Sequence, residues 1–320
     1  MAQDLAAYAT ELGFLACGIA SLEPSRRGEA LDAWLGAGYG GTMRYLHRQA
    51  ARRKRPGEIV PGAAVAVVVL DNYLPAAPGS GERGTGNGRV KVAKYALGED
   101  YHRALTRRLG RIADWLRERG ATIAQVWADA GPVPERELAE RAGLGWIGKN
   151  TMLIRPESGS FCLIGTVFTD LALVPASAAA FDRCGSCTRC LEACPTGALV
   201  APRVLDATRC TSYLTIESRL PIPDALVDQL EGWAFGCDIC NDVCPWNVRF
   251  AAPTTLPAYQ DRGAIAVDDP GFFDRMAPEE FSARFGDTPL ERPGLAGMRR
   301  NWAAGFRSRA GATPSKTAGP

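Results

Sequence analysis

The segment CGSCTRCLEACP, residues 184–195, carries the most specific pattern in this 320-residue chain. Its spacing, C-x2-C-x2-C-x3-C-P, is typical of modules that hold two cubane 4Fe–4S clusters. In such modules the first three cysteines hold one cluster, and the cysteine before the proline binds the other. The segment CDICNDVCP, residues 237–245, repeats the pattern without its first cysteine. Cys210 stands alone between the two segments and can supply the missing ligand.

We therefore assign eight of the ten cysteines to two interleaved clusters, with Cys194 and Cys244 each crossing to the other cluster. The first set is Cys184, Cys187, Cys190 and Cys244, and the second set is Cys194, Cys210, Cys237 and Cys240. Paired structural zinc sites also use C-x2-C ligands. Zinc requires neither the triple C-x2-C-x2-C nor the proline after each x3 step, so the pattern favours clusters and predicts electron transfer.

The bulk composition is that of an ordinary soluble protein, with 46% hydrophobic and 22% charged residues. No run of 18 apolar residues occurs, and the N-terminus carries acids and lacks the basic region of a signal peptide. We therefore expect a cytoplasmic protein without a membrane span. Cysteines in that compartment are more often metal ligands than disulfides. Cys17 and Cys162, which lie in apolar stretches, are expected to be core residues.

Helical and strand patterns alternate along the first half of the chain and predict an α/β sandwich. They include an apolar strand at 63–70, a strand at 90–96 and a long amphipathic helix at 100–119. The predicted domains are an α/β catalytic domain, a cysteine module, and a basic C-terminal segment with one helix and an unstructured end, at residues 1–172, 173–250 and 251–320.

Positive charge is concentrated in two stretches although the net charge is only +2. Residues 44–55 contain six Lys or Arg and no acid, and residues 284–320 contain seven Lys or Arg against two acids. Basic surfaces of this kind favour a polyanionic partner such as nucleic acid. An ordinary solvated face explains the charge alone equally well.

Several glycine-rich stretches match nucleotide-binding motifs in sequence, but the secondary structure predicted around them does not fit such motifs. G-x-G-x-x-G occurs at residues 36–41 and 79–84, but neither match leaves a strand and opens a helix. Residues 143–150 come within one residue of a P-loop but follow a helix and end in Asn. We therefore expect no NAD(P)H or ATP site, and electrons that arrive from an external donor.

Few residues in the first domain are suited to redox or proton chemistry. Asp129 follows a strand end, where α/β proteins place reactive groups, although it would equally serve as a helix cap. His102 lies in the first turn of the long helix, where local hydrogen bonds are an equally good explanation. His47 lies in the basic stretch and is expected at the surface.

Several of these segments together resemble the epoxyqueuosine reductase family: KYALGEDYH (94–102), DAGPVPER (129–136), RAGLGWIGKNT (141–151), GSF (159–161) and the cysteine module. The resemblance covers roughly residues 13–301. It implies an α/β (α+β) fold in which a nitroreductase-like cobalamin-binding domain precedes a ferredoxin-like module with two 4Fe–4S clusters. It also implies reduction of epoxyqueuosine to queuosine at the wobble position of tRNA, with base-off cobalamin.

The resemblance further implies roles for individual residues. Asp129 would be the general acid, since a carboxylic acid suits delivery of a proton to the departing oxygen. The residues expected to contact cobalamin or substrate are Arg53, His102, Asp129, Lys149 and Asn150. The residues expected to contact tRNA are Ser212, Arg299 and Arg300.

The implied partners are the anticodon stem-loop of a tRNA and an external electron donor such as ferredoxin or flavodoxin, and we expect a monomer. Two alternatives stay open. Reductive dehalogenases share the layout of a cobalamin domain followed by two clusters, but they are usually exported, and the basic surfaces here favour RNA over a small molecule. A plain electron carrier would leave the large first domain unexplained.

Overall fold

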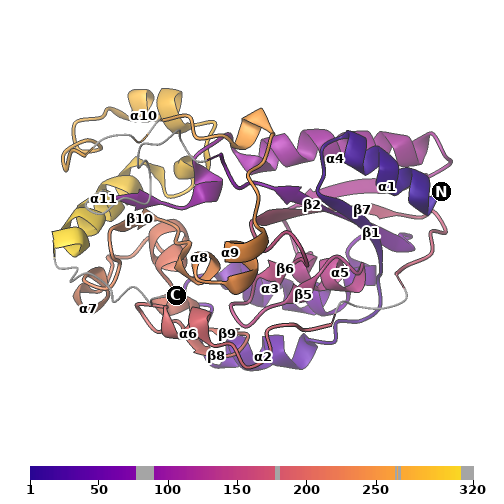
Figure 1. Ribbon diagram of the computed structural model, residues 1–320, viewed down its shortest axis with the longest axis horizontal. Helices are drawn as coiled ribbons and strands as arrows, with labels where there is room; N and C mark the ends of the chain where they lie inside the picture. Colours follow the sequence, from indigo (N-terminus) through magenta and orange to yellow (C-terminus); the bar gives the residue numbers. More distant parts are fainter. Residues whose placement is uncertain (77–89, 177–180, 264, 266–267, 311–320) are drawn as a thin grey trace.

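The computed structural model describes residues 1–76, 90–176, 181–263, 265 and 268–310. The glycine-rich motif at 79–84 and the expected unstructured end at 311–320 lie outside the described residues. Figure 1 shows a sheet covered by helices on both faces, with the cysteine module and the C-terminal helices packed beside it. Within the described part, no helix is long and apolar enough to cross a membrane.

The central sheet is antiparallel throughout, which makes the first domain α+β. Its strands follow the order β1, β2, β7, β4, with Ala20 opposite Ala66 and Val67 opposite Val167. The central strand β2 is a continuous apolar run because helices cover both of its faces. The strands are β1 (Ala16–Ser21), β2 (Val65–Asn72), β4 (Ala124–Ala128) and β7 (Cys162–Thr169).

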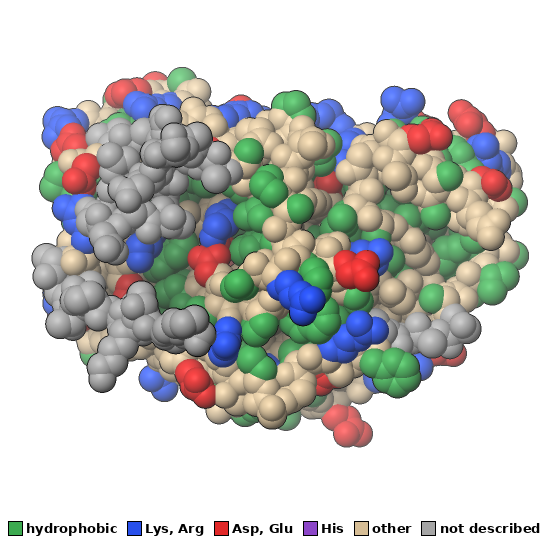
Figure 2. Space-filling view, in the orientation of Figure 1, with side chains coloured by type: hydrophobic (Ala, Val, Ile, Leu, Met, Phe, Trp, Pro, Cys, Tyr) green, Lys and Arg blue, Asp and Glu red, His purple; other side chains and the backbone are tan. Residues whose placement is uncertain are grey.

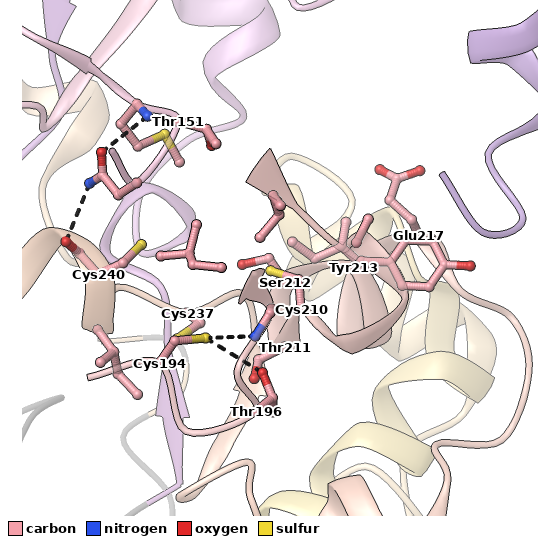
Figure 3. Close-up of a pocket in the computed structure, with 18 of the residues that line it drawn as sticks. Thr151, Cys194, Thr196, Cys210, Thr211, Ser212, Tyr213, Glu217, Cys237 and Cys240 are labelled. Carbon is pink, nitrogen blue, oxygen red and sulfur yellow. Dashed lines mark hydrogen bonds between the residues drawn. The ribbon is translucent and has the colours of Figure 1, made fainter. Parts of the chain in front are cut away.

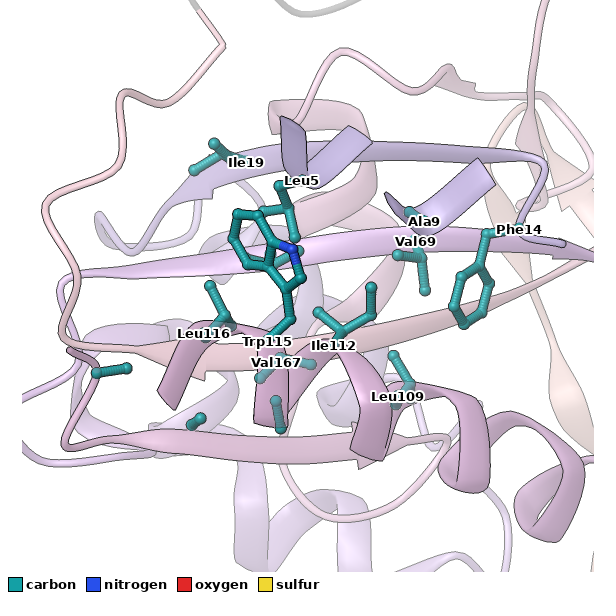
Figure 4. Close-up of a cluster of buried hydrophobic side chains, with 14 of the residues drawn as sticks. Leu5, Ala9, Phe14, Ile19, Val69, Leu109, Ile112, Trp115, Leu116 and Val167 are labelled. Atoms are coloured by element: carbon teal, nitrogen blue, oxygen red, sulfur yellow. The ribbon is translucent and has the colours of Figure 1, made fainter. Parts of the chain in front are cut away.

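Helices α1 (Ala2–Glu11) and α4 (Tyr101–Arg117) cover one face of the sheet. The predicted apolar stripe of α4 is buried against β2 and β7, and its members are Leu105, Leu109, Ile112 and Leu116. Figure 4 shows the helix side chains directed onto the strands. Asp100 caps α4 by accepting a hydrogen bond from the backbone N–H of His102 at 2.9 Å.

The same side of the sheet holds a buried ion pair. The carboxylate of Asp71, at the end of β2, is fully buried and accepts hydrogen bonds from Arg108 of α4 and from the hydroxyl of Tyr259. Burial raises the pKa of Asp71, and the charge of Arg108 and the Tyr259 hydrogen bond oppose that rise. The pair ties the long helix to the sheet.

Helix α5 (Glu135–Arg141) covers the other face, where Leu138 and Ala139 pack against the alternate side chains of β2. Helices α2 (Gly28–Gly36) and α3 (Arg44–Lys54) follow β1 and pack on each other. The basic stretch expected from the sequence thus forms a helix, α3, with no buried residue.

A second hydrophobic core forms in the C-terminal segment, which was expected from the sequence to be a basic tail. Strand β3 (Lys91–Val92) pairs in parallel with β10 (Trp233–Phe235), and α10 (Pro278–Phe285) and α11 (Gly294–Ala310) pack beside them. Aromatic side chains fill this core, which explains why the C-terminal segment is folded: Phe273, Phe281, Phe285 and Trp302. The first-domain segment 90–96 thus contributes to a C-terminal core, and the domain boundaries proposed from the sequence stay a prediction.

The expected strand at 90–96 is wrong in its length. Only Lys91 and Val92 form a strand, and after the extended Ala93 a 3₁₀ turn follows at Lys94–Ala96. The backbone N–H of Lys94 donates to the buried carboxylate of Asp238 at 2.8 Å, and the ammonium of Lys94 reaches Asp242 at 2.6 Å. These bonds to the cysteine module replace the continued strand ladder.

The cysteine module consists of short elements, and its helices α6 and α8 lie against each other. Its elements are α6 (Arg189–Glu192), β8 (Leu199–Ala201), β9 (Val204–Leu205), α7 (Asp224–Val227), α8 (Ile239–Asp242) and α9 (Pro245–Phe250). The hairpin of β5 (Trp146–Ile147) and β6 (Leu153–Ile154) joins the first domain to it. Single turns lie at Pro56–Glu58, Ala207–Arg209, Tyr213–Glu217, Pro257–Tyr259 and Pro289–Glu291.

Candidate active site

Two adjoining cavities lie where the first domain meets the cysteine module. The smaller, of about 290 Å³, is lined by Asp129 and Tyr101 and by the second set of cysteines. The larger, of about 950 Å³, extends toward α2 and α3. Eight residues line both cavities and make them one continuous site: Met43, Asp129, Arg136, Thr151, Leu205, Ala207, Glu217 and Arg292.

The second set of cysteines gathers around the smaller cavity. Figure 3 shows its members at one end, and all four are among the lining residues: Cys194, Cys210, Cys237 and Cys240. Burial raises the pKa of Cys240, and the neighbouring thiolates of Cys210 and Cys194 raise it further. Apolar burial keeps a thiol protonated, so a bound metal is what would hold these sulfurs as thiolates.

The first set of cysteines does not line the smaller cavity. Burial raises the pKa of Cys190, followed by the charges of Cys244, Cys184 and Cys187, so these sulfurs are neighbours. None of them is among the described residues that line the smaller cavity. The described residues contain no group of three His, Cys, Asp or Glu close enough to hold a single metal ion. That spacing is compatible with a cubane, in which each thiolate binds a separate iron.

Asp129 occupies the turn between β4 and α5 and faces the cavity. Its backbone adopts φ 47°, in the left-handed region that Asp tolerates better than most residues. Its backbone N–H donates to the carboxylate of Glu135 at 2.7 Å, which fixes the turn. The Asp129 side chain remains 62% exposed and is therefore accessible to a ligand in the cavity.

Two aromatic residues at the start of α4 flank the Asp129 carboxylate. The hydroxyl of Tyr101 donates to its Oδ2, and the His102 ring stacks on Tyr101 with its Nε2 at 4.0 Å from the same oxygen. Burial, followed by the charge of Asp129, raises the pKa of Tyr101, so the phenol stays protonated and donates. A hydrogen bond to Asp100 raises the pKa of His102 and favours the imidazolium beside Asp129.

Arg53 and Glu135 hold the turn that carries Asp129. Arg53 donates to the carbonyls of Gly131 at 2.9 Å and Val133 at 3.3 Å, and it lines the larger cavity. Its Nε is buried and has no partner among the described residues. Desolvation, and then the charge of Asp129, raise the pKa of Glu135 well above its ordinary value. A second carboxyl that stays protonated near neutral pH therefore lies next to Asp129.

Asn150 and Lys149, predicted to contact cobalamin or substrate, occupy different places. Asn150 is buried, lines the smaller cavity, and donates to the carbonyl of Cys240 at 3.3 Å. Lys149 lines neither cavity; its ammonium donates to the carbonyls of Gly185 at 2.7 Å and Cys187 at 2.9 Å. The position of Lys149 thus gives no support to its predicted contact with cobalamin or substrate. Its side chain instead holds the loop of the first cysteine set.

The residues predicted to contact tRNA lie partly inside the protein. Ser212 lines the smaller cavity beside Cys210 (Figure 3). Arg299 donates to the carbonyls of Phe273 and Met276, and Arg300 donates to backbone carbonyls of the segment 214–220. Both guanidinium groups therefore brace the C-terminal core, and their predicted phosphate contacts have no support from these positions.

Three features of the larger cavity bear on whether it can hold the cobalamin that the resemblance implies. A volume of about 950 Å³ is at the upper end of the usual range for ligand pockets, about 300–1,000 Å³. Among the described residues, neither cavity is lined by a histidine, as a cofactor without a lower histidine ligand requires. Arg53 lines the larger cavity, so its side chain lies next to a group bound there. The cavity therefore fits a large base-off cobalamin.

Four functional candidates were missed from the sequence: Tyr101, Glu135, Arg292 and Trp146. Tyr101 stands next to His102 in the quoted motif, and its role becomes visible only when α4 and the turn after β4 are brought together. Arg292 lines both cavities and pairs with Glu217 at 2.7 Å. No sequence signal distinguishes it from the other arginines of the C-terminal segment.

Comparisons with known proteins agree with this site. The family model described as "4Fe-4S double cluster binding domain" matches residues 183–247, which contain all eight assigned cysteines. The model described as "Epoxyqueuosine reductase QueG, DUF1730" matches residues 53–130, which end just past Asp129. The first match confirms the two-cluster module predicted from the cysteine spacing.

Full-length relatives extend the similarity over most of the chain. The epoxyqueuosine reductase of Pseudomonas aeruginosa is 38% identical over 307 residues, which are 96% of this chain and 85% of the relative. That of Synechocystis sp. is 38% identical over 89% of this chain and 98% of the relative.

Solved structures agree with the fold. An epoxyqueuosine reductase in complex with a tRNA-Tyr stem loop modified with epoxyqueuosine has a TM-score of 0.88 and 29% identity, covering 97% of this chain and 82% of its own. A Bacillus subtilis epoxyqueuosine reductase, described with its catalytic aspartate loop swung out of the active site, has a TM-score of 0.85 and 28% identity over the same shares. The predicted fold class, α/β (α+β) with a two-cluster module, is confirmed. This chain belongs to the epoxyqueuosine reductase family.

Proposed function

We propose that this protein reduces the epoxide of epoxyqueuosine in tRNA to the cyclopentene of queuosine. The observation that supports this proposal best is the shared cavity. Asp129, a carboxyl group accessible to ligand, and the second set of cysteines both line its smaller part. A proton donor and an electron source therefore face the same space.

The reaction sets clear chemical requirements. Removing the epoxide oxygen converts the carbon–oxygen bonds into a carbon–carbon double bond and releases water, which consumes a pair of electrons and a pair of protons. When bound, cobalamin and the two 4Fe–4S clusters supply the reducing electrons. The protein must hold these groups, deliver the protons at the departing oxygen, and position the modified nucleotide.

In this proposal Asp129 delivers the proton to the departing oxygen. After donation its carboxylate keeps the hydrogen bond from the Tyr101 hydroxyl, and the His102 imidazolium lies 4.0 Å away to stabilise the charge. His102 and the protonated carboxyl of Glu135, which lie beside Asp129, are the proposed sources of the second proton. Arg53 affects proton delivery indirectly, because its hydrogen bonds to Gly131 and Val133 hold the turn that carries Asp129.

Helix α3 offers a surface for the tRNA backbone at the mouth of the larger cavity. One side of the helix, which includes Leu46 and Arg53, lines that cavity. Arg44, Arg48 and Arg52 follow each other at a spacing of four residues and are exposed. Over the described residues, the face seen in Figure 2 mixes basic, acidic and apolar side chains and presents no continuous basic surface. Helix α3 is therefore the better candidate for phosphate contacts.

The first set of cysteines is placed to receive electrons. It lies away from the smaller cavity, whereas the second set lines it. We propose that a small cytoplasmic one-electron carrier, such as ferredoxin or flavodoxin, docks on the side of the first set, and that the enzyme acts as a monomer in the cytoplasm.

The test uses the full chain, reconstituted anaerobically with iron, sulfide and cobalamin and supplied with a chemical reductant. We expect conversion of epoxyqueuosine to queuosine in an anticodon stem-loop, measured by nucleoside mass spectrometry. The controls omit cobalamin or replace Cys194 with Ser. A protein with both clusters and cobalamin that leaves the nucleoside unchanged would refute the proposed function.

A further inference from the structure

Trp146, at the start of β5, lies against the first set of cysteines. Its indole Nε1–H donates a hydrogen bond to the sulfur of Cys184 at 3.4 Å. The side chain is 1% exposed, so water does not compete for this N–H. Trp246 packs edge-on against the same ring, with centroids 5.0 Å apart, and completes an apolar cluster with Cys184 and Cys244. A buried indole thus directs its single polar group at one cysteine sulfur.

This contact has a consequence once a cluster is bound. The sulfur of Cys184 then stands for a thiolate coordinated to iron. Reduction adds one electron, and its charge spreads over the irons and their sulfur ligands. A hydrogen-bond donor to a ligand sulfur stabilises the reduced cluster more than the oxidised one and raises its reduction potential. Burial strengthens the effect because the local dielectric is low.

The second set has donors of its own. The sulfur of Cys194 accepts a hydrogen bond from the backbone N–H of Ala198 at 3.3 Å and lies 3.6 Å from the hydroxyl of Thr196. Figure 3 shows both contacts at the wall of the smaller cavity. A thiolate has no hydrogen to donate, so in the loaded protein the Thr196 hydroxyl is the donor. The two clusters would therefore be tuned by separate side chains.

We propose that Trp146 raises the reduction potential of the cluster held by the first cysteine set and so makes that cluster easier for an external donor to reduce. The proposal rests on the proposed assignment of Cys184 as a cluster ligand. Trp146 is a positioning and tuning residue in this account and touches no substrate. Its ring also fills core space, so the test must separate the N–H from the ring.

Trp146→Phe makes that separation, because it keeps an aromatic ring and removes the N–H. The full chain, reconstituted anaerobically with iron and sulfide, is titrated with a reductant while both clusters are followed by electron paramagnetic resonance. We expect the midpoint of one cluster to move to a more negative potential while the other stays in place. Thr196→Val should move the other cluster instead. Trp246→Phe is the matched control and should move neither.

Equal shifts of both clusters in Trp146→Phe, or none, would overturn the proposal while leaving the proposed function intact. Loss of both clusters from the wild-type protein would instead refute the ligand assignment. If Trp146→Phe fails to load its clusters, the Trp246→Phe protein is labelled with nitrogen-15 in its indoles. Pulsed paramagnetic resonance should then detect an indole nitrogen coupled to a reduced cluster, and the absence of that coupling would overturn the proposal.

Discussion

Replacing Asp129 with Asn removes the transferable proton and changes little else. The turn at Asp129 is held by its backbone N–H bond to Glu135, and this bond survives the substitution. Asn also tolerates the φ of 47° found there. Its side-chain oxygen can still accept the hydrogen bond from Tyr101. We therefore expect Asp129→Asn to keep the fold, both clusters and cobalamin, and to lose turnover.

The expected loss of rate in Asp129→Asn follows from the role of Asp129 as a general acid. A positioned general acid contributes roughly 10²–10⁴-fold to a rate, which corresponds to about 3–5 kcal/mol of transition-state stabilisation. Because Tyr101 and His102 would still polarise the site, we expect a loss within this range and some residual activity. The binding of the tRNA stem-loop should stay close to that of the wild type, so the effect falls on kcat.

The assay compares single-turnover reduction by pre-reduced Asp129→Asn and wild-type protein with matched iron, sulfide and cobalamin contents. Asp114→Asn is the control, since Asp114 is an exposed residue of α4 that pairs only with Arg117 among the described residues. It should react like the wild type. Turnover of Asp129→Asn within a few-fold of the wild-type rate would refute Asp129 as the proton donor.

Three further predictions concern charge. His102, whose pKa is raised above its ordinary 6.5 by the hydrogen bond to Asp100, should keep its proton to higher pH; turnover should therefore fall on the alkaline side, where Glu135 also loses its proton, and His102→Gln should change the midpoint of that limb of the pH–rate profile, whereas an unchanged limb would exclude His102 as a proton source. Arg108→Met strands the buried carboxylate that it neutralises and should cost about 3–5 kcal/mol in urea unfolding, whereas an unchanged midpoint would contradict the buried ion pair. Replacing Arg44, Arg48 and Arg52 with Gln should weaken stem-loop binding and flatten its salt dependence by about one unit of slope for each lost contact; an unchanged slope would exclude α3 from the interface.

Local pattern predicted much of the first domain correctly. The long helix begins at Tyr101 and ends at Arg117, within two residues of its predicted bounds, because an apolar stripe and an Asp100 cap specify it. The cysteine spacing predicted the two-cluster module because the chemistry of the cluster restricts the spacing of its ligands. The position of Asp129 after a strand was also correct.

Long-range contacts explain what the sequence did not reveal. β3 pairs with β10, which lies far along the chain, and the C-terminal core depends on this pairing. Local periodicity contains no information about such a partner. The contact of Tyr101 with Asp129 likewise joins segments that are not adjacent in sequence.

Counts of basic residues were the least reliable guide. Arg299 and Arg300 stand in a basic stretch, yet both guanidinium groups are occupied by carbonyls of their own chain. Arg44, Arg48 and Arg52 of α3 are exposed, whereas Arg53 of the same helix is bonded to carbonyls of the turn after β4. Charge in a sequence shows neither the direction of a side chain nor its partners, and these decide whether a phosphate can bind.

The positions of the two iron clusters and of the cobalt can be measured by anomalous X-ray diffraction at the iron and cobalt edges, on crystals of the reconstituted protein. We expect two iron clusters, one on Cys184, Cys187, Cys190 and Cys244 and the other on Cys194, Cys210, Cys237 and Cys240. We expect the cobalt in the shared cavity, between Asp129 and the second cluster. Cobalt bound elsewhere, or a cysteine set without iron, would contradict this account.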